Sequence, residues 1–265
     1  MRLRVLLFLS FMLFFTAESH ASITVVGNLA QQSVMLPGET HEGIITLRNL
    51  GTEPSEVRVY QTDYSFSSDG KTLYGTPGES PRSNAGWIII QPNRMTISPG
   101  TTAPVYYTIK VPEDPELIGT FWSIVMVEEI SNTSPESSNQ SRSVGIQAVM
   151  RYGVQLITEI ADTGTNSLKF LDRQYIISED GTKTFQIDLE NNGEKWYIPD
   201  LMIEVYDSSG NNVEHFEGSN RRIFPGCSVR HLIDITSLPA GKYKFLVIVD
   251  TGDENVYGAE YDLEL

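Results

Sequence analysis

The chain contains a single cysteine, Cys227, among its 265 residues. No disulfide can form within the chain, so this thiol is either buried or available to another chain. Cys227 directly follows a Pro-Gly pair and precedes a run of residues with strand character. We therefore expect the thiol to be buried within a turn and strand.

Catalytic and metal-binding motifs are missing as well. The sequence has no Cys-His cluster, no HExxH pattern, no GxSxG elbow and no glycine-rich phosphate loop. Three histidines, His41, His215 and His231, lie far apart beyond residue 21, and we expect them on the surface. The sequence thus predicts a protein that is not an enzyme and that binds no cofactor and no metal.

Two weaker patterns leave alternatives open. Asp-Thr-Gly occurs at residues 162–164 and 250–252, and aspartic proteases use two such aspartates to share one proton. Acidic segments at 207–212 and 250–255 contain oxygen ligands of the kind that calcium prefers. Both patterns are also typical of turns, and the turn interpretation is favoured in each case.

Basic residues are scarce, with 19 Lys and Arg against 34 Asp and Glu. Arg2 and Arg4 precede an apolar run at residues 5–15, and small residues at 19 and 21 follow it, which predicts a signal peptide cleaved after Ala21. Cleavage removes two arginines and Glu18, which leaves 17 basic and 33 acidic residues and a net charge of −16. We expect a soluble protein outside the cytoplasm that inserts into no membrane and binds no nucleic acid.

Short segments of strand character recur along the chain, separated by Gly, Pro, Asn and Asp, and no helical stripe of three turns is present. A polar segment at residues 133–142 predicts a flexible loop. This pattern predicts an all-β sandwich protein. We predict strands of the first half at residues 23–26, 33–36, 43–48, 56–63, 87–90, 94–97, 105–111, 120–130 and 144–157.

The second half of the sequence repeats three segments of the first half in the same order. ITLRNLG at 45–51 returns as IDLENNG at 187–193, ISPG at 97–100 returns as IFPG at 223–226, and residues 117–127 return at 238–249 with one insertion. Three collinear matches predict two copies of one immunoglobulin-like domain in tandem. We predict a signal peptide at 1–21, a first domain at 22–157, a linker at 158–165 and a second domain at 166–265.

Residues 144–157, VGIQAVMRYGVQLI, form the longest alternating segment of the chain. All seven even positions are apolar or aromatic, and Val149 and Ile157 are the only bulky apolar residues out of phase. The alternation predicts one β-strand, well beyond the usual length of about 5–6 residues. Such a strand can pack into its own domain at one end and offer apolar side chains at the other.

The first half resembles the periplasmic pilus-assembly chaperones of the PapD-like family. The resemblance rests on the order of several weak features: a Pro37-Gly38 turn, Trp87 followed by Pro92, Pro99-Gly100 before a strand ending in IKVP at 109–112, a variable loop, and the long last strand. The second half agrees with the family in size and class. The resemblance implies two immunoglobulin-like domains set at an angle.

In that family the last strand of the first domain lends apolar side chains to a fibre subunit that lacks one strand, which is a form of β-augmentation. The resemblance implies that Tyr152, Val154 and Leu156 stay in the domain's own core. The alternative is that the whole alternating row packs inside the first domain. The residues that the resemblance assigns to the donated row are Val144, Ile146, Ala148 and Met150.

Family members hold the terminal carboxylate of the subunit with an arginine on the first strand and a lysine on the last. The corresponding residues here are Ser33 and Gln155, so both charges are missing. Arg151 shares a face of the predicted strand with Gln155 and is the candidate replacement. The alternative is that Arg151 is a solvating residue on an exposed strand edge.

Two functions are compatible with the sequence. The resemblance implies a periplasmic chaperone without enzyme activity whose partners are pilus or surface-fibre subunits, with an outer-membrane usher as a further partner. The alternative is an exported structural or adhesive surface protein in which two immunoglobulin-like domains form a stalk.

Overall fold

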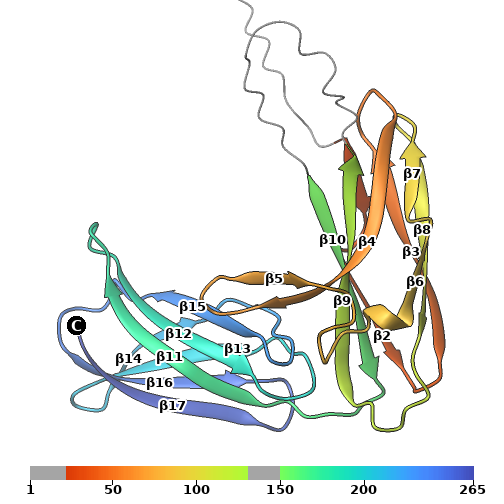
Figure 1. The fold of residues 1–265 in the computed structure, drawn as a ribbon. Helices are drawn as coiled ribbons and strands as arrows, with labels where there is room; N and C mark the ends of the chain where they lie inside the picture. Colours follow the sequence, from red (N-terminus) through yellow and green to blue (C-terminus); the bar gives the residue numbers. More distant parts are fainter. Residues whose placement is uncertain (1–21, 131–149) are drawn as a thin grey trace, which may run out of the picture.

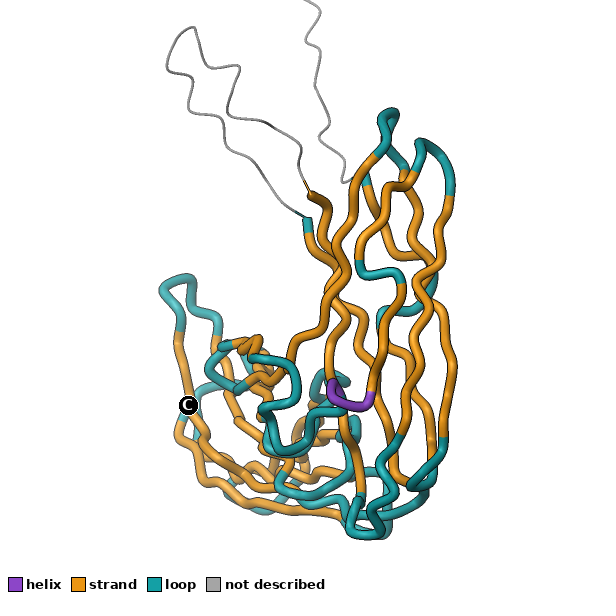
Figure 2. Tube along the Cα trace, turned by 45° about the vertical axis from the view of Figure 1, so that its right-hand side comes forward, coloured by secondary structure: helices purple, strands orange, loops and turns teal. Residues whose placement is uncertain are grey.

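β-strands build almost all of the described structure. The computed structural model describes residues 22–130 and 150–265, and its one helix there is the short 3-10 helix η1 (Ala85–Trp87). Figure 1 shows two sandwiches set at an angle, and Figure 2 shows the same angle after a 45° turn. The predicted all-β class with two immunoglobulin-like sandwiches is confirmed. Within the described ranges no helix is long and apolar enough to cross a membrane.

The first sandwich consists of two sheets, with the strand orders β1-β3-β8-β6 and β2-β10-β9-β4-β5, and β7 pairs with β4. Strands β10 and β2 run parallel, whereas β10 and β9 run antiparallel. The two sheets enclose one apolar core. The strands are β1 (Ile23–Val26), β2 (Ala30–Met35), β3 (Thr40–Asn49), β4 (Ser55–Phe66), β5 (Thr72–Gly75), β6 (Ile88–Gln91), β7 (Arg94–Ile97), β8 (Thr102–Lys110), β9 (Gly119–Ile130) and β10 (Arg151–Ile160).

The second sandwich has a three-stranded sheet, β11-β12-β15, and a four-stranded sheet, β14-β13-β16-β17. Inward-facing residues alternate with outward-facing ones along β12, β13 and β16, and they include the fully buried Phe185, Val205 and Phe245. The strands are β11 (Leu168–Ile177), β12 (Lys183–Asn191), β13 (Asp200–Asp207), β14 (Asn212–Glu217), β15 (Ser228–Asp234), β16 (Lys242–Asp250) and β17 (Val256–Glu264).

The predicted strands at residues 23–130 coincide with observed strands to within a few residues, and those at 23–26 and 94–97 match β1 and β7 at both ends. Of the strand predicted at 144–157, residues 151–157 lie in β10, and residues 144–149 lie outside the described residues. Strand β5 was not predicted, because four exposed residues carry no alternating pattern. The predicted loop at 133–142 lies outside the described residues. The domain boundaries at 22–157 and 166–265 stay a prediction, and β10 itself continues to Ile160.

The repeat found in the sequence has the same hydrogen bonds in both sandwiches. The amide Nδ2 of the buried Asn49 donates to the carbonyl oxygen of Ile97 at 2.9 Å. Asn191 makes the corresponding bond to the carbonyl oxygen of Ile223, also at 2.9 Å. The repeated Asn-x-Gly and Pro-Gly segments therefore close equivalent turns. Further equivalent bonds run from Gly100 N to Asn49 O at 2.9 Å and from Gly226 N to Asn191 O at 2.7 Å.

One apolar cluster joins the two sandwiches. Trp122 of β9 and Ile157 of β10 pack with the core of the second sandwich. The indole ring of Trp122 stacks on Phe224 with ring centroids 4.6 Å apart and planes at 13°, and its Nε1 donates to the carbonyl oxygen of Tyr64 at 2.7 Å. Val154 and Leu156 point into the first core, whereas Ile157 lies on the opposite face of β10, which faces the second sandwich. This explains why Ile157 is apolar although it is out of phase with the rest of the strand.

The hairpin formed by β4 and β5 extends beyond the first sandwich and lies along the second (Figure 1). Tyr64 and Phe66 near the end of β4 pack against the shared cluster. At the turn of the hairpin, Ser68 N donates to Ser228 Oγ at 2.9 Å. The hairpin is therefore held on the second sandwich by both apolar and polar contacts.

The chain passes between the sandwiches through a tight junction built around Glu194. Gly119 and Gly164 have φ angles of +72° and +82°, and a Cβ on Gly119 would lie 2.2 Å from the carbonyl oxygen of Glu194. Thr120 N donates to that oxygen at 2.8 Å, and the Glu194 carboxylate accepts from Thr165 N at 2.9 Å. Hydrogen bonding from Thr165 lowers the pKa of Glu194. Only glycine fits at these two positions.

Candidate functional site

The described part of the long alternating strand passes from buried to exposed toward its N-terminal end. Val154 and Leu156 are fully buried in the first core, and Tyr152 packs against that core in part. Met150, the next even position, is 53% exposed. The prediction that Tyr152, Val154 and Leu156 stay in the domain's own core is confirmed. The other residues of the predicted donated row, Val144, Ile146 and Ala148, lie outside the described residues.

The N-terminal part of β10 has one open edge. Strand β9 pairs with β10 along its whole length, from Arg151 to Ile160. On the other side, β2 pairs with β10 only from Gln155 onward, where Gln155 lies opposite Ala30. Residues 151–154 therefore have no strand partner on that side within the described part of the chain. An open edge of this kind presents backbone N–H and C=O groups to an additional strand.

Arg151 lies at the start of this open edge and already has a partner. Its guanidinium Nη2 is 3.4 Å from Glu128 Oε1, and Arg58 Nη2 is 2.9 Å from the other oxygen of the same carboxylate. The hydrogen bond from Arg58 is the main cause of the lowered pKa of Glu128. The side chain of Arg151 is exposed, and its role as a carboxylate anchor stays a prediction.

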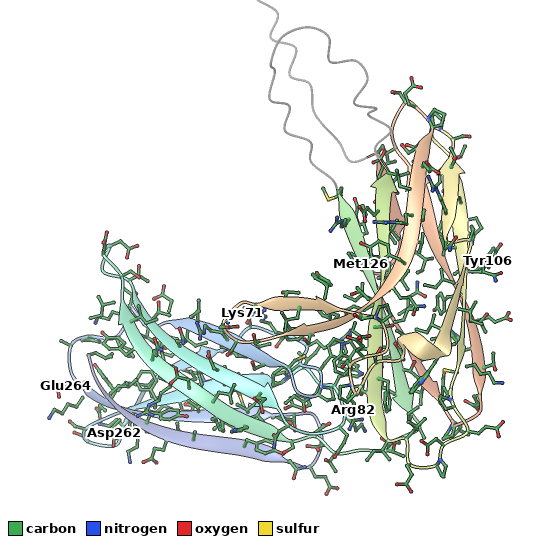
Figure 3. All side chains as sticks on the ribbon, viewed as in Figure 1. Lys71, Arg82, Tyr106, Met126, Asp262 and Glu264 are labelled. Carbon is green, nitrogen blue, oxygen red and sulfur yellow. The ribbon has the colours of Figure 1, made fainter. Side chains whose placement is uncertain are left out.

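A pocket of about 320 Å³ lies between the two sandwiches, next to Gln155. The hairpin, β10 and the segment between β14 and β15 each contribute to it. Figure 3 shows Lys71 at the end of the hairpin that lies over the second sandwich. The lining side chains fall into aromatic groups, Tyr64, Phe66 and Phe224, and cationic groups, Lys71, Arg221 and Arg222. We call this pocket the basic cleft pocket.

Neither arginine of the basic cleft pocket forms an ion pair with a carboxylate of the described residues, although the charge of Glu159 acts on Arg222. The guanidinium of Arg222 lies 4.2 Å from the ring centroid of Trp196, and burial lowers its pKa. Arg221 donates to the carbonyl oxygen of Arg230 at 3.3 Å, whereas Lys71 is paired with Asp69. Two guanidinium groups without an ion-pair partner in one pocket favour a carboxylate or another anion.

Only one of the residues predicted from the sequence to bind the client belongs to this pocket. Gln155 lines the pocket. Ser33 of β2 lies opposite Thr158 of β10 and does not line the pocket. The cations come from Lys71 in a turn and from Arg221-Arg222 in the second sandwich, far from β2 and β10 in the sequence. The adjacent arginines, directly before the repeated IFPG segment of an acidic chain, were the one available signal.

The remaining aspartates singled out in the sequence make structural contacts, two of them within local turns. Asp162 forms an ion pair with Lys195 at 2.7 Å, and Asp250 accepts a hydrogen bond from Gly252 N at 2.7 Å. Asp207 accepts from the backbone of Ser209 at 2.8 Å. No group of three or more metal-ligating side chains occurs in the described ranges. The turn interpretation of these acidic segments therefore fits their geometry.

Cys227 is buried, as predicted. Its side chain lies in the shared apolar cluster, and burial raises the pKa of the thiol to about 11. At neutral pH the group is a thiol with little thiolate character, so it has little reactivity as a nucleophile.

The surface position expected for the histidines is wrong for His231. This side chain is 1% exposed, because it lies on the same inward face of β15 as Val229 and Ile233, which are two residues away on either side. Neither ring nitrogen has a hydrogen-bond partner in the described structure. Burial lowers the pKa of His231 to about 4, and the positive charge of Arg221 contributes in the same direction. His215, in contrast, is exposed.

No protein-family model matches the chain, and a search of curated proteins finds no match. Solved structures do match along most of its length. The class 5 fimbriae chaperone CfaA is 12% identical with a TM-score of 0.48, covering 92% of this chain and 100% of its own. A chain of the CsuC–CsuE complex of Acinetobacter baumannii is 14% identical (TM-score 0.46; 91% and 98% covered), and the E. coli chaperone DraB is 14% identical (0.42; 92% and 98%).

The chain is similar to fimbrial chaperones. The resemblance to PapD-like chaperones that the sequence predicts is thereby confirmed as a resemblance. At 12% and 14% identity the likeness to these structures concerns the fold alone.

Proposed function

We propose that this chain is an exported chaperone of the bacterial periplasm that binds subunits of a surface fibre by strand donation. It carries out no chemical reaction. The single observation that carries the proposal is the open edge of residues 151–154 beside the exposed Met150. Delivery of the bound subunit to an outer-membrane usher belongs to the same proposal.

The alternation of the strand supports this mechanism. The even residues from Val154 onward are fixed in the chaperone's own core, which holds the strand in an extended conformation without help from the client. Toward the N-terminal end the same row supplies Val144, Ile146, Ala148 and Met150 to the client. Backbone hydrogen bonds along the edge give affinity, and side chains two residues apart fill successive pockets of the incomplete subunit.

The basic cleft pocket supports a second contact with the client. Arg221 and Arg222 form no ion pair in the described structure, and they line one pocket with Gln155 of the strand proposed to bind the client. A terminal carboxylate of the client fits this pocket, because a guanidinium group binds a carboxylate with two parallel hydrogen bonds. In this arrangement the second sandwich supplies the charge that Ser33 and Gln155 lack, and Arg151 is the alternative anchor at the open edge.

Strand donation is tested by replacing Ile146 and Met150 together with aspartate. Burying an apolar side chain of this size contributes about 1.5–3 kcal/mol, and a carboxylate in an apolar pocket of the client is strongly unfavourable. We expect no detectable complex with a fibre subunit of the same host, when that subunit is refolded from denaturant in the presence of the full chain. Circular dichroism is expected to stay unchanged.

The matched control is Ile44→Asp, which alters an exposed isoleucine on β3, in the other sheet of the first sandwich. This variant is expected to bind the subunit as the unaltered chain does. Undiminished complex formation by the Ile146 and Met150 double variant, with its fold intact, overturns the proposal. Retention of the protein on the cell surface instead of release with the periplasmic fraction favours the structural or adhesive alternative.

The anchor is tested by replacing Arg221 and Arg222 with glutamine, singly and together. A hydrogen bond to a charged group contributes about 1.5–3 kcal/mol, so each single variant is expected to weaken subunit binding about tenfold or more. Arg222→Lys keeps the charge and separates electrostatic loss from lost packing on Trp196. Arg48→Gln, on the exposed face of β3, is the control. If only Arg151→Gln weakens binding, the anchor lies at the open edge and not in the basic cleft pocket.

A further inference from the structure

Strand β5 has a free edge within the described structure. It is the last strand of the six-stranded sheet, and β4 is its one partner there. Ser67 N donates to Lys71 O at 3.0 Å, which fixes the alternation of the hydrogen-bonded pairs along the hairpin. Leu73 and Gly75 accordingly direct their backbone groups toward β4. Thr72 and Tyr74 direct theirs outward.

The free edge of β5 is short, at four residues, but it lacks two common protections against pairing with another chain. The strand sequence TLYG contains no proline and no charged residue, and both devices are common on edge strands that must stay single. Leu73 is 63% exposed and Tyr74 is 59% exposed. Because successive residues of a strand point to opposite faces, an added strand would find an apolar side chain on each face.

The hairpin is fixed in position, so its edge is ready for binding. Phe66 stands edge-on to Phe224 of the second sandwich with ring centroids 6.3 Å apart, and Ser68 N is bonded to Ser228. Tyr64 and Tyr74 pair across the hairpin at 5.7 Å. A strand that adds to β5 therefore has to order little of the protein that receives it.

The free edge of β5 adjoins the surface proposed to bind the client. Lys71 and Thr72 line the basic cleft pocket together with Gln155 of β10. Figure 1 shows β5 on the side of the hairpin away from the second sandwich, facing the space in front of β10. The basic cleft pocket thus adjoins β5 through Thr72 and β10 through Gln155, the residue that follows the open edge.

We infer that β5 is a second docking edge for the same client. An extended segment of the fibre subunit adds to residues 72–75 and bonds to the outward backbone groups of Thr72 and Tyr74, while Leu73 and Tyr74 cover its side chains. The client is then held by β-augmentation at two edges, one on each side of the basic cleft pocket. This inference rests on the proposed function, because the occupant is the subunit bound at β10.

Amide hydrogen exchange tests the inference directly. The probe is the complex of the full chain with the fibre subunit refolded in its presence, compared with the free chain by NMR. We expect exchange at the Thr72 and Tyr74 amides to slow at least tenfold in the complex. The Leu73 and Gly75 amides, which face β4 in both states, are expected to change much less. Equal protection of all four amides, or of none, overturns the inference.

A pair of substitutions at Tyr74 supplies an independent measurement. Tyr74→Pro removes the outward N–H, whereas Tyr74→Ala keeps it and removes the ring. We expect the proline variant to bind the subunit about tenfold more weakly than the alanine variant, the effect of one lost backbone hydrogen bond. Circular dichroism and the exchange of the Ser67 amide check that the hairpin persists. Equal affinity of the two variants overturns the inference.

The two proposals fail in different ways. If the Ile146 and Met150 double variant binds the subunit normally, strand donation itself is wrong. If that variant fails to bind but β5 shows neither the alternating protection nor the difference between the Tyr74 variants, strand donation stands and the second docking edge is wrong.

Discussion

Replacing Trp122 with alanine is expected to lower the free energy of unfolding by about 3–5 kcal/mol, the usual cost of removing a buried large aromatic side chain. The indole ring of Trp122 belongs to the first sandwich by sequence but to the shared cluster by packing. Its removal eliminates the stack on Phe224 and leaves the carbonyl oxygen of Tyr64 without its 2.7 Å hydrogen bond. Both of these interactions contribute to the contact between the two sandwiches, so the substitution weakens that contact.

The effect on the contact is separated from the effect on stability by small-angle X-ray scattering and thermal unfolding. We expect Trp122→Ala to broaden the distribution of distances between the sandwiches and to split one unfolding transition into two. Trp87→Ala is the control, because Trp87 packs against Phe121 in a tilted pair, with ring centroids 4.7 Å apart, next to the core of the first sandwich. The control is expected to lower stability without changing the scattering. An unchanged scattering profile for Trp122→Ala contradicts the prediction.

Acid is expected to destabilise the protein through His231. The pKa of this residue is about 4 in the folded chain, against 6.5 for an ordinary histidine. As the pH falls below 6.5, His231 binds a proton in the unfolded chain but not in the folded chain, so unfolding becomes more favourable. The loss grows until the pH reaches the folded pKa and amounts to about 3 kcal/mol.

Urea unfolding at pH 7 and at pH 4.5 measures this loss, with His231→Leu as the comparison. Many carboxylates also titrate in this range, so the informative quantity is the difference in pH dependence between the unaltered chain and the variant. We expect the variant to be less sensitive to acid by most of the calculated amount. His215→Gln, which alters an exposed histidine, is expected to keep the full sensitivity. Identical pH dependence of the unaltered chain and His231→Leu contradicts the prediction.

The fold was predictable because its signals are local or repeated. Strands β1 and β7 were placed at both ends from turns and alternation alone. The internal repeat was readable because Asn49 and Asn191 carry out the same hydrogen bonding in both sandwiches, which requires the same short sequence around each. Ile157 was identified as out of phase, but its contact with the second sandwich depends on the arrangement of two domains, which periodicity does not encode.

The candidate site was predictable only in part. The alternation of residues 144–157 identifies the strand, and the burial of Val154 and Leu156 agrees with it. The cations next to Gln155 were missed, because Lys71 and Arg221 reach the cleft only through the path of the hairpin and the angle between the sandwiches. His231 was expected on the surface although apolar residues lie two positions before and after it, a pattern that already indicates an inward side chain.

The junction around Glu194 has a consequence for association. Since Gly119 lies too close to Glu194 for any side chain, the two sandwiches are in direct backbone contact beside the connection between them. A partner that contacts both arms of the angle does not have to immobilise one arm against the other. The entropic cost of fixing the two arms relative to one another arises once, when the chain folds. It therefore does not reduce the free energy of binding to a partner. Lengthening this connection would therefore weaken binding without altering a single contact residue.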